Sequence, residues 1–424
     1  MKLAINGGKK TIDYSFKKYN TIGSEEINAA KSVIESGILS DYLATWGDKF
    51  NGGEKVKEFE KNCEEFFQVK HAITVNSWTS GLTTAIGATD IEPGDEVIVS
   101  PLTMSASATS ILHWNAIPVF ADIEPDYFCI DPNAIKEKIT SRTRAILAVD
   151  IYGQSAEMDE INLIASKNDL IVISDSAQSP GAIYKDKYAG TLADIGGYSL
   201  NRHKHIHTGE GGIIVTDNDD YADRMRLIRN HAESIVEDKG SENLSNMIGY
   251  NFRLGEIESA IAIEQLKKLP YFVEKRQNVA QLLNDGLKDL DYLEIPKVRN
   301  NSNHIFYYYP LTVNTKELKI SRNLIIDALL AEGIQGISKG YQPLHLLPMY
   351  QKKIAYGSKN FPWQLNKNNI DYSKGICPIA EKLFFEEFFA IQVCLFDLSE
   401  KDISLIIEAF HKVWNNLSEI SNKL

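Results

Sequence analysis

The densest group of reactive side chains in this sequence lies in residues 199–212, SLNRHKHIHTGEGG. Lys204 stands between His203 and His205, and a glycine-rich turn follows. Alternating histidines share one face of a strand and can bind a metal ion. Arg202 and Lys204 bring positive charge beside any bound cation, so we expect no metal here. A lysine that forms a Schiff base is the better interpretation, although surface lysines are common and Lys204 alone proves little.

A candidate phosphate site lies earlier in the chain than the lysine segment, in residues 76–81, NSWTSG. This segment links a predicted strand to a predicted helix, where free backbone N–H groups and the hydroxyls of Thr79 and Ser80 suit one phosphate group. A simple helix N-cap explains the same residues and is the more economical interpretation of them alone. The sequence has no GxGxxG after its first strand and no P-loop motif, so we expect neither a dinucleotide nor a P-loop nucleotide.

Asp175 directly follows the apolar run 170–174. A carboxylate at the end of a buried strand has to be solvated, paired or directed at a cation. One use is to keep the pyridine nitrogen of pyridoxal phosphate protonated, which lets that cofactor accept electrons. Capping of the next segment is the other interpretation, and the residue alone does not decide between the two.

Short β-rich runs recur along the first half of the chain, and helical segments separate several of them. The runs are 71–75, 96–100, 117–121, 145–149, 170–174, 195–199 and 212–216, and the helical segments include 79–88, 106–114 and 158–168. This alternation predicts an α/β fold with a mostly parallel sheet covered by helices on both faces. Ligands of such sheets bind beyond the carboxyl ends of the strands. We therefore expect Asp175, Lys204 and the other polar segments after these strands to meet in one crevice.

A second, smaller unit is predicted after residue 270. Residues 255–269 are apolar almost all round in their middle, which predicts a helix buried in a core or subunit interface and ended by Pro270. Beyond it we expect a helix over 272–289, a strand at Tyr307–Tyr309, and helices over 321–332 and 400–416. The prediction is a large domain over residues 1–270, N-terminal segment included, and a small C-terminal α+β domain over residues 271–424.

The net charge and the composition limit which kinds of binding partner and which compartment we expect. The chain has 424 residues, a formal net charge of −12 at pH 7 and a sequence pI of about 5.3. No basic surplus exists to neutralise phosphates, so we expect no nucleic acid and no anionic membrane as a partner. Without a run of 18 apolar residues or an apolar leader, we expect no membrane span and no signal peptide. Four scattered cysteines without a CxxC pair are typical of reduced thiols in a cytoplasmic protein.

The combination of these features is much more specific than any one of them. A Ser/Thr helix start is followed by a strand-end aspartate and then by a lysine before TGEGG. In this combination the sequence resembles the DegT/StrS family of pyridoxal-phosphate-dependent sugar aminotransferases, which have the fold type I architecture of aspartate aminotransferase. The resemblance runs over essentially the whole chain through VNSWTSGL, EPGDEVIVSPLT, PVFADIEP, DIYGQ, DSAQSPGA, YSLNRHKHIHTGEGG, RNHAE and GYNFRLGEIESAIAIEQLKKL, then YQPLHLLPMY and GICPIAEKL.

The resemblance implies a role for each matched residue. Lys204 is expected to form the Schiff base with pyridoxal 5'-phosphate and to carry the proton between the cofactor and the substrate carbon. Asp175 should pair with the pyridine nitrogen, and Gln178 should lie near the phenolic oxygen. The residues expected to bind the phosphate are Thr79, Ser80 and Ser199.

The GYNFR segment reaches, in that family, into the active site of the neighbouring subunit. By this resemblance Asn251 touches the phosphate bound in the partner subunit. Arg253 is a candidate for binding the carboxylate of the amino donor, because a guanidinium binds a carboxylate through two parallel hydrogen bonds. Each site then needs two chains, so the expected working unit is a homodimer with shared active sites.

The sequence departs from the family pattern at three positions. Met104 stands where the family usually has an aromatic ring stacked on the pyridine, so we expect weaker stacking. Trp78 replaces the usual glycine of NSGT, and Asp150 replaces a usual histidine. These changes leave the chemistry intact and bear on the substrate. We expect His203 and Trp78 to line the substrate pocket.

The resemblance implies transfer of an amino group, with glutamate as the donor, to a keto-sugar. Family frequency favours a nucleotide-linked 4-keto-6-deoxyhexose, used in amino-sugar or lipopolysaccharide biosynthesis. A free sugar-acid or cyclitol carbonyl, such as an oxidised octulosonate or an inosose, is the second acceptor class. A pyridoxal-phosphate-dependent dehydratase and a cofactor-binding regulator without turnover are the alternatives. Some dehydrating relatives have histidine in place of the lysine, so Lys204 favours transamination.

Overall fold

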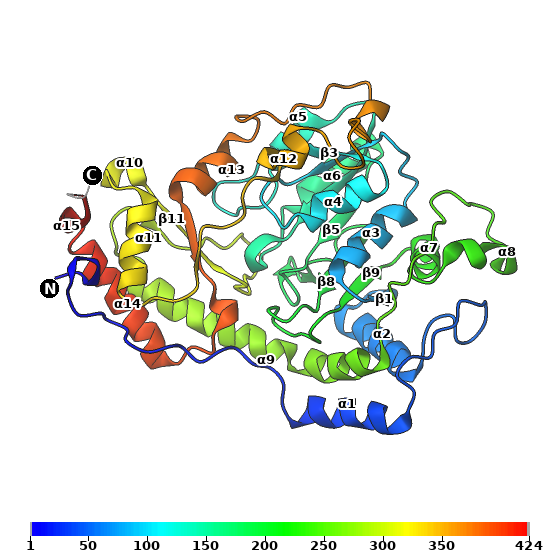
Figure 1. The fold of residues 1–424 in the computed structure, drawn as a ribbon, viewed down its shortest axis with the longest axis horizontal. Helices are drawn as coiled ribbons and strands as arrows, with labels where there is room; N and C mark the ends of the chain where they lie inside the picture. Colours follow the sequence, from blue (N-terminus) through cyan, green and yellow to red (C-terminus); the bar gives the residue numbers. More distant parts are fainter. Residues whose placement is uncertain (1, 422–424) are drawn as a thin grey trace.

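The computed structural model describes residues 2–421, and a seven-stranded sheet forms the centre of its larger part (Figure 1). The strands lie in the order β1 (His71–Val75), β9 (Gly212–Thr216), β8 (Ile195–Ser199), β5 (Ile171–Asp175), β4 (Thr143–Val149), β2 (Glu96–Val99) and β3 (Ile117–Phe120). Strand β9 runs antiparallel to both of its neighbours, and all other pairs are parallel. The predicted mostly parallel α/β sheet is therefore confirmed.

Helices pack around this sheet, and its strands are buried almost throughout. The helices of this part are α1 (Ser24–Ser36), α2 (Glu54–Phe67), α3 (Trp78–Ala88), α4 (Ala106–His113), α5 (Pro132–Lys138), α6 (Met158–Asn168), α7 (Asp219–Arg229) and α8 (Val236–Lys239). A two-stranded hairpin, β6 (Ile183–Tyr184) and β7 (Lys187–Tyr188), follows β5. Every residue of β2, β3, β8 and β9 is buried, as expected for strands with apolar side chains on both faces.

A second sheet of four antiparallel strands builds the other part. Its order is β10 (Leu293–Glu294), β11 (Tyr309–Val313), β13 (Phe388–Ile391) and β12 (Ile337–Ser338). The helices after residue 300 are α10 (Thr315–Leu318), α11 (Arg322–Ala331), α12 (Pro348–Gln351), α13 (Pro378–Lys382), α14 (Glu400–Trp414) and α15 (Ser418–Ser421). The strand predicted at Tyr307–Tyr309 begins only at Tyr309. The backbone N–H of Tyr307 is used elsewhere, donating to the carbonyl of Tyr152 at 2.8 Å.

One long helix, α9 (Glu256–Leu287), runs beneath both parts (Figure 1). The prediction that Pro270 ends this helix is wrong, because α9 is continuous over 32 residues with Pro270 inside it. Proline removes one backbone hydrogen bond and strains the preceding turn. Burial on either side outweighs this cost: Leu266 and Leu269 lie in one core cluster, and Leu283 and Leu287 lie in another.

The two cores also divide the chain differently from the predicted domains. The N-terminal segment was assigned to the large domain, but Leu3, Ile12 and Phe16 lie in the core of the smaller sheet. Conversely, Tyr350 and Trp363, which are late in the sequence, belong to the core of the seven-stranded sheet. The boundary at residue 270 falls inside α9. Core packing by itself does not define domains, so the division into domains 1–270 and 271–424 stays a prediction.

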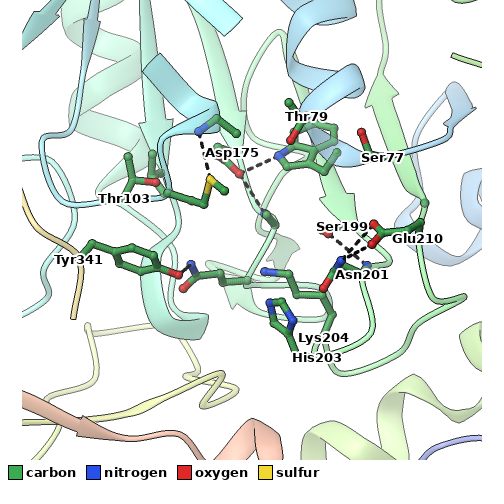
Figure 2. Close-up of a pocket in the computed structure, with 17 residues that line it drawn as sticks. Ser77, Thr79, Thr103, Asp175, Ser199, Asn201, His203, Lys204, Glu210 and Tyr341 are labelled. Atoms are coloured by element: carbon green, nitrogen blue, oxygen red, sulfur yellow. Dashed lines mark hydrogen bonds between the residues drawn. The ribbon is translucent and has the colours of Figure 1, made fainter. Parts of the chain in front are cut away.

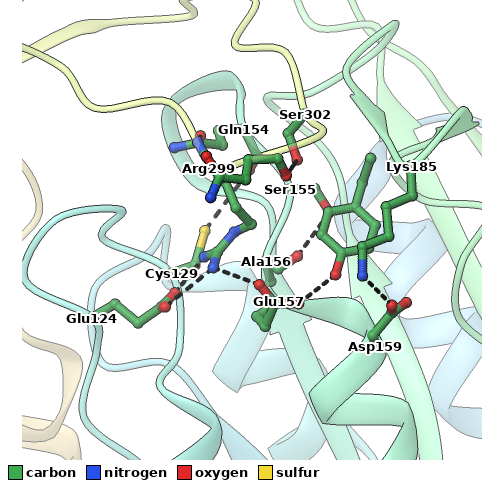
Figure 3. Close-up of polar contacts among 12 residues, drawn as sticks. Glu124, Cys129, Gln154, Ser155, Ala156, Glu157, Asp159, Lys185, Arg299 and Ser302 are labelled. Atoms are coloured by element: carbon green, nitrogen blue, oxygen red, sulfur yellow. Dashed lines mark hydrogen bonds and ion pairs between the residues drawn. The ribbon is translucent and has the colours of Figure 1, made fainter.

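An ion-pair cluster around the buried Arg299 ties the segment between β10 and β11 to loops of the seven-stranded sheet (Figure 3). Arg299 donates to the carboxylates of Glu124, which follows β3, and Glu157, which precedes α6. Its backbone N–H donates to Gln154 at 2.6 Å, and its guanidinium lies 4.2 Å from the ring centroid of Tyr127. Arg299 therefore fastens this connection to the edge of the sheet where the polar strand ends gather.

Candidate active site

A cavity of about 210 Å³ lies beyond the carboxyl ends of the parallel strands, where the sequence predicted a crevice (Figure 2). Its walls come from segments that follow five different strands. Residues after strand ends that line it are Ser77 after β1, Thr103 and Met104 after β2, Val149 at the end of β4, Asp175 at the end of β5, and Ser199 at the end of β8. Lys204 and His203, from the loop after β8, also line it.

Lys204 projects into this cavity from the loop between β8 and β9 (Figure 2). The loop is closed at its base by a hydrogen bond from the Leu200 N–H to the Gly211 carbonyl, 2.9 Å long. The ammonium nitrogen of Lys204 lies 4.4 Å from the ring centroid of Tyr307 and has no hydrogen bond or ion pair with any residue in 2–421. Burial lowers the pKa of Lys204 to about 8, because the charged form loses its hydration.

The carboxylate of Asp175 is fixed by three hydrogen bonds. The indole N–H of Trp78 donates to one oxygen at 2.7 Å, and the backbone N–H of Ala177 donates to the same oxygen at 3.2 Å. The hydroxyl of Ser107 donates to the other oxygen at 2.7 Å. Charge-assisted bonds of this kind hold a carboxylate in one orientation. Asp175 is therefore an oriented carboxylate on the cavity wall, and its contact with the Ala177 N–H caps the next segment as well.

Trp78 reaches Asp175 because strand β8 has a glycine directly beneath its ring. A Cβ atom added to Gly197 would lie 2.2 Å from the Trp78 ring and 2.2 Å from the carbonyl oxygen of Ile213. Only glycine allows so close an approach. Trp78 was predicted as a wall of the substrate pocket. It does line the cavity, but it is almost fully buried, and its N–H is taken by Asp175.

The start of α3 supplies the hydroxyl end of the cavity. Ser77 and Thr79 line it together with Ser199. Ser80 does not: its hydroxyl donates to Asn76 at 2.6 Å, and its backbone N–H donates to the capping Ser77 hydroxyl at 3.1 Å. Phosphate binding by Ser80 stays a prediction, and Ser77 is the serine of this segment that lines the cavity. Ser77 is the N-cap residue of α3 and was not predicted; its place immediately before the helix is the signal that could have found it.

Gln178 and Met104 also line the cavity, as predicted. The side-chain oxygen of Gln178 accepts from the Tyr152 N–H at 2.8 Å, and its amide N–H donates to the Tyr341 hydroxyl at 3.0 Å. Tyr341 belongs to the later part of the chain and was not predicted. Met104 is 53% exposed, and its sulfur accepts from the backbone N–H of Ala106 at 3.2 Å. A half-exposed thioether replaces the usual ring at this wall.

The three histidines of the lysine loop do not share one face. His203 lines the cavity, and burial together with the neighbouring cations lowers its pKa to about 4, so its ring is neutral at neutral pH. His205 is fully buried, and its Nε2 bonds to the carbonyl of Ile305 at 2.7 Å. Among residues 2–421, no group of three or more His, Cys, Asp or Glu side chains could hold a metal ion.

Asn251 and Arg253 lie outside the cavity of their own chain. The side chain of Asn251 is exposed, and Arg253 donates from Nε to its side-chain oxygen at 2.7 Å. This position agrees with the expectation that both residues serve a second subunit, which stays a prediction.

The donor set of the cavity fits pyridoxal phosphate. At one end the start of α3 and the hydroxyls of Ser77, Thr79 and Ser199 provide donors for a phosphate group. At the other end Asp175 offers an oriented negative charge for a protonated ring nitrogen. Between them lies Lys204, a buried amine without an ion-pair partner among the described residues, as an aldehyde-bearing cofactor requires.

The fold and the site define a class of protein that includes solved sugar aminotransferases. The structure of PseC from Helicobacter pylori, an aminotransferase involved in the biosynthesis of pseudoaminic acid, superimposes with a TM-score of 0.78 at 27% sequence identity. The match covers 95% of this chain and 100% of that one. An aminotransferase from Psychrobacter cryohalolentis matches with a TM-score of 0.80 at 26% identity, over 95% of this chain and 100% of the other.

The chain belongs to the DegT/DnrJ/EryC1/StrS aminotransferase family, whose model matches residues 22–369. It is 35% identical to the spore coat polysaccharide biosynthesis protein SpsC of Bacillus subtilis, over 81% of this chain and 87% of that protein. It is 36% identical to the GDP-perosamine synthase of Caulobacter vibrioides, over 70% of this chain and 79% of that protein. A putative L-glutamine:3-amino-2,3-dideoxy-scyllo-inosose aminotransferase of Micromonospora echinospora is 28% identical over 100% of this chain and 99% of its own.

These similarities make the protein a pyridoxal-phosphate-dependent sugar aminotransferase. In the part of the chain that the structure describes, no helix has the length and apolar character needed to cross a membrane.

Proposed function

We propose that the protein transfers an amino group from an amino acid, glutamate being the expected donor, to the carbonyl carbon of a keto-sugar. One observation carries the proposal: the Lys204 amine, buried and without an ion-pair partner among residues 2–421, faces the same cavity as the oriented Asp175 carboxylate. Both groups line one cavity, and no salt bridge joins the amine to the carboxylate. Their separate placement suits a ligand that lies between them.

Bound pyridoxal phosphate supplies an aldehyde that takes up the amino group and a ring that accepts the electron pair of a broken C–H bond. The residues of the chain do the rest. Asp175 would keep a proton on the ring nitrogen, because its three donors hold the negative charge in place. Lys204 would take up and return the proton of the substrate carbon at its Nζ atom. A pKa of about 8 leaves part of Lys204 neutral near neutral pH, as a general base requires.

Three further groups would hold the cofactor in register. Thr79 and Ser199, with the start of α3, would bind the phosphate. Gln178 is immobilised by its bonds to Tyr152 and Tyr341, so it would present a fixed edge to the ring's phenolic oxygen.

The acceptor class that we favour is a nucleotide-linked 4-keto-6-deoxyhexose. The GDP-perosamine synthase, at 36% identity, and the spore coat polysaccharide protein, at 35%, support a role in amino-sugar or polysaccharide biosynthesis. A free cyclitol or sugar-acid carbonyl is the second candidate. The relative named as an inosose aminotransferase favours it, since that match extends over the whole chain, whereas the family model stops at residue 369.

We also infer a homodimer with shared active sites. Asn251 and Arg253 lie outside the cavity of their own chain, and only a second chain would give them a ligand to bind. The exposed apolar side chains of Ile27 and Ile34 on α1 offer a surface that a second chain would cover.

The decisive experiment separates the two half-reactions. Cofactor-loaded enzyme is mixed with L-glutamate, and the cofactor absorbance and the 2-oxoglutarate released are measured; L-glutamine is tested in parallel. The aminated enzyme is then offered nucleotide-linked keto-sugars, inososes and sugar acids. Return of the original absorbance together with an amino-sugar product supports the proposal and identifies the acceptor.

The control is Lys204→Ala, which should bind the cofactor and lose amino transfer. Loss of water from the sugar without consumption of glutamate would identify a dehydratase and refute the proposal. Cofactor binding with no turnover of any donor would identify a regulator and refute it as well.

A further inference from the structure

Asp150 is a buried carboxylate that the proposed reaction does not use. It follows strand β4 directly, is 0% exposed, and does not line the cavity that holds Lys204. It is also one of the three departures from the family pattern, so its contacts belong to this chain. A carboxylate shielded from water needs hydrogen-bond donors. The identity of those donors shows which part of the site Asp150 supports.

Three serines from one short segment, residues 174–179, donate to Asp150. The hydroxyls of Ser174 and Ser176 both donate to its carboxylate oxygen Oδ2, the first at 2.9 Å. The hydroxyl of Ser179 donates to its backbone carbonyl at 2.8 Å. All the serines of this segment, whose sequence is SDSAQS, are therefore bonded to one residue.

The remaining residues of the same segment face the cavity. Asp175, Ala177 and Gln178 line it, and the three serines do not. The backbone is held as well, because the N–H of Asp150 donates to the carbonyl of Asp175 at 3.0 Å. This bond extends the parallel pairing of β4 with β5, in which Val149 lies opposite Asp175. Asp150 thus holds the segment from the side away from the cavity.

The charge of Asp150 contributes to this hold. Burial raises the pKa of its carboxyl to about 6, and the hydroxyls of Ser176 and Ser174 and the backbone N–H of Ala156 oppose that rise. The carboxyl is therefore mostly ionised near neutral pH. An ionised carboxylate accepts hydrogen bonds at both oxygens, whereas an amide in its place has one acceptor oxygen and a competing N–H donor. Loss of the charge should loosen the serines.

We propose that Asp150 is a positioning residue for the cofactor site, whose carboxylate orients residues 174–179 so that Asp175 and Gln178 both face the cavity. The inference rests on the proposed function, in which these two side chains contact the ring of pyridoxal phosphate. Asp150 itself touches neither cofactor nor substrate. A displacement of about 1 Å can lower a rate about a hundredfold. We therefore expect effects on the cofactor ring and on kcat, and none on the binding of the amino donor.

Protonation of the ring nitrogen gives a readout that needs no turnover. Pyridoxal phosphate, isotope-labelled at its ring nitrogen, is bound to the wild type, to Asp150→Asn and to Asp175→Asn, and the nitrogen NMR resonance is recorded. We expect Asp150→Asn to move the resonance toward that of the unprotonated ring, in the same direction as Asp175→Asn and by less. A resonance that moves in Asp175→Asn and stays at the wild-type position in Asp150→Asn overturns the inference alone. A wild-type resonance in Asp175→Asn overturns the pairing of Asp175 with the ring nitrogen, and the inference with it.

Cofactor affinity and kinetics supply two further readouts. Pyridoxamine phosphate has no aldehyde for Lys204, so its dissociation constant, measured by equilibrium dialysis, reports the non-covalent contacts. That constant should rise about fivefold in Asp150→Asn, as expected for the loss of one hydrogen bond. In the loaded enzyme kcat should fall about tenfold, with KM for L-glutamate unchanged. A raised KM with wild-type kcat would place the effect on substrate binding and overturn the inference.

Asp95→Asn is the matched control. Asp95 is also a buried carboxylate and accepts from the backbone N–H of Glu92 at 2.9 Å. It precedes strand β2, at the edge of the sheet opposite the cavity. This variant should leave the nitrogen resonance, the dissociation constant and kcat at their wild-type values. Changes in Asp95→Asn equal to those in Asp150→Asn would show a general effect of lost buried charge, and the positioning role would be wrong.

Ser176→Ala decides the matter if Asp150→Asn fails to fold. It removes one donor to Asp150 and leaves the carboxylate in place. We expect the nitrogen resonance to move in the same direction and the dissociation constant of pyridoxamine phosphate to rise about threefold. Ser155→Ala is its control, because Ser155 is equally buried and donates to the Ala156 carbonyl at 3.0 Å, not to Asp150. If Ser176→Ala behaves as Ser155→Ala does, the inference is overturned.

Discussion

Asp175 shows how one residue depends on neighbours that are far apart in the sequence. Its carboxylate is oriented by the indole of Trp78, the hydroxyl of Ser107 and the backbone of Ala177. Trp78 stands where a glycine is usual in the resembling family, so its N–H is an addition of this chain. A donor that stabilises the charged carboxylate would also help it keep a proton on the ring nitrogen of a bound cofactor.

Trp78→Phe should retain the fold and lower kcat about tenfold, because a hydrogen bond to a charged group contributes about 1.5–3 kcal/mol and only part of it acts in the transition state. Steady-state kinetics on the loaded enzyme measure the effect. Trp114→Phe is the matched control. Trp114 is also buried, but its indole N–H donates to the Thr83 carbonyl and makes no bond to Asp175, so kcat should not change. Equal kcat values for both variants would contradict the role of the indole N–H.

The lowered pKa of Lys204 predicts its chemical reactivity. Only the neutral amine reacts with a small acylating reagent, and burial brings its pKa down to about 8. In the cofactor-free protein, labelling of Lys204 should therefore be half-maximal near pH 8 and slow below it. Mass spectrometry of the labelled peptides gives the profile. Lys185, whose pKa is raised by its hydrogen bond to Asp159, should need far more alkaline conditions. A Lys204 midpoint near the ordinary value of about 10.4 would show that the cavity is hydrated.

Sequence patterns identified the site residues that directly follow strands. They did not identify residues that reach the site from distant parts of the chain. Lys204 and Asp175 could be identified because each has a fixed place relative to a strand or a glycine turn. Tyr307 and Tyr341 could not, because they come from more than a hundred residues later in the chain and no local pattern marks their approach. Ser107 lies inside a helix and has an ordinary sequence context. Such contacts depend on long-range packing, which no short segment of the sequence predicts.

At the scale of elements, burial of apolar side chains keeps a helix continuous at a position where the local sequence predicts its end. A proline normally ends a helix, yet α9 continues through Pro270, because apolar residues on both sides of it are buried in the two cores. The seven strands of the larger sheet were predictable, since each is a short apolar run between turns. The assignment of the N-terminal segment was not, because Leu3 and Phe16 carry no sign of which core they enter.

The Arg299 cluster gives a prediction about the connection between the sheets. Arg299→Met removes the ion-pair partner of Glu124 and of Glu157, although Glu157 keeps the hydroxyl of Tyr184 as a donor. Burial already raises the pKa of Glu124. We expect a loss of about 2–3 kcal/mol in the free energy of unfolding at pH 7, measured by urea denaturation. Lys297→Met removes an exposed pair nearby and should cost less than about 1 kcal/mol.

The pH dependence of this variant has a definite sign. Without Arg299 the folded-state pKa of Glu124 lies further above its unfolded value, so protonation relieves the penalty as the pH falls through that pKa. The deficit of Arg299→Met should therefore shrink between pH 7 and pH 5. A deficit that stays constant over this range would show that packing, and not the unpaired carboxylates, accounts for the loss.

At the scale of the whole molecule, a single chain exposes an apolar surface, and Asn251 and Arg253 lie outside its own cavity. Exposed apolar side chains gather on α1 and the segment after it: Ile27, Ile34, Ile38, Leu39, Leu43 and Trp46. A second chain that covered them would bury a patch of the kind that marks interfaces. Asn251 and Arg253 begin the segment that leads into α9, which packs against α1 and α2. The same interface could therefore carry both residues to the neighbouring cavity.

Subunit exchange tests this arrangement. Lys204→Ala and Arg253→Ala should each be nearly inactive as homodimers, because every site then lacks one of its two residues. When the two proteins are mixed and allowed to exchange subunits, about half of the dimers become mixed. In a mixed dimer one site carries both lesions and the other carries neither, since the lysine and the arginine of each site come from opposite chains. Activity should recover to roughly a quarter of the wild-type value by two-fold symmetry. If exchange is demonstrated by mass spectrometry and no activity returns, Lys204 and Arg253 serve the same site from one chain, and the shared-site arrangement is wrong.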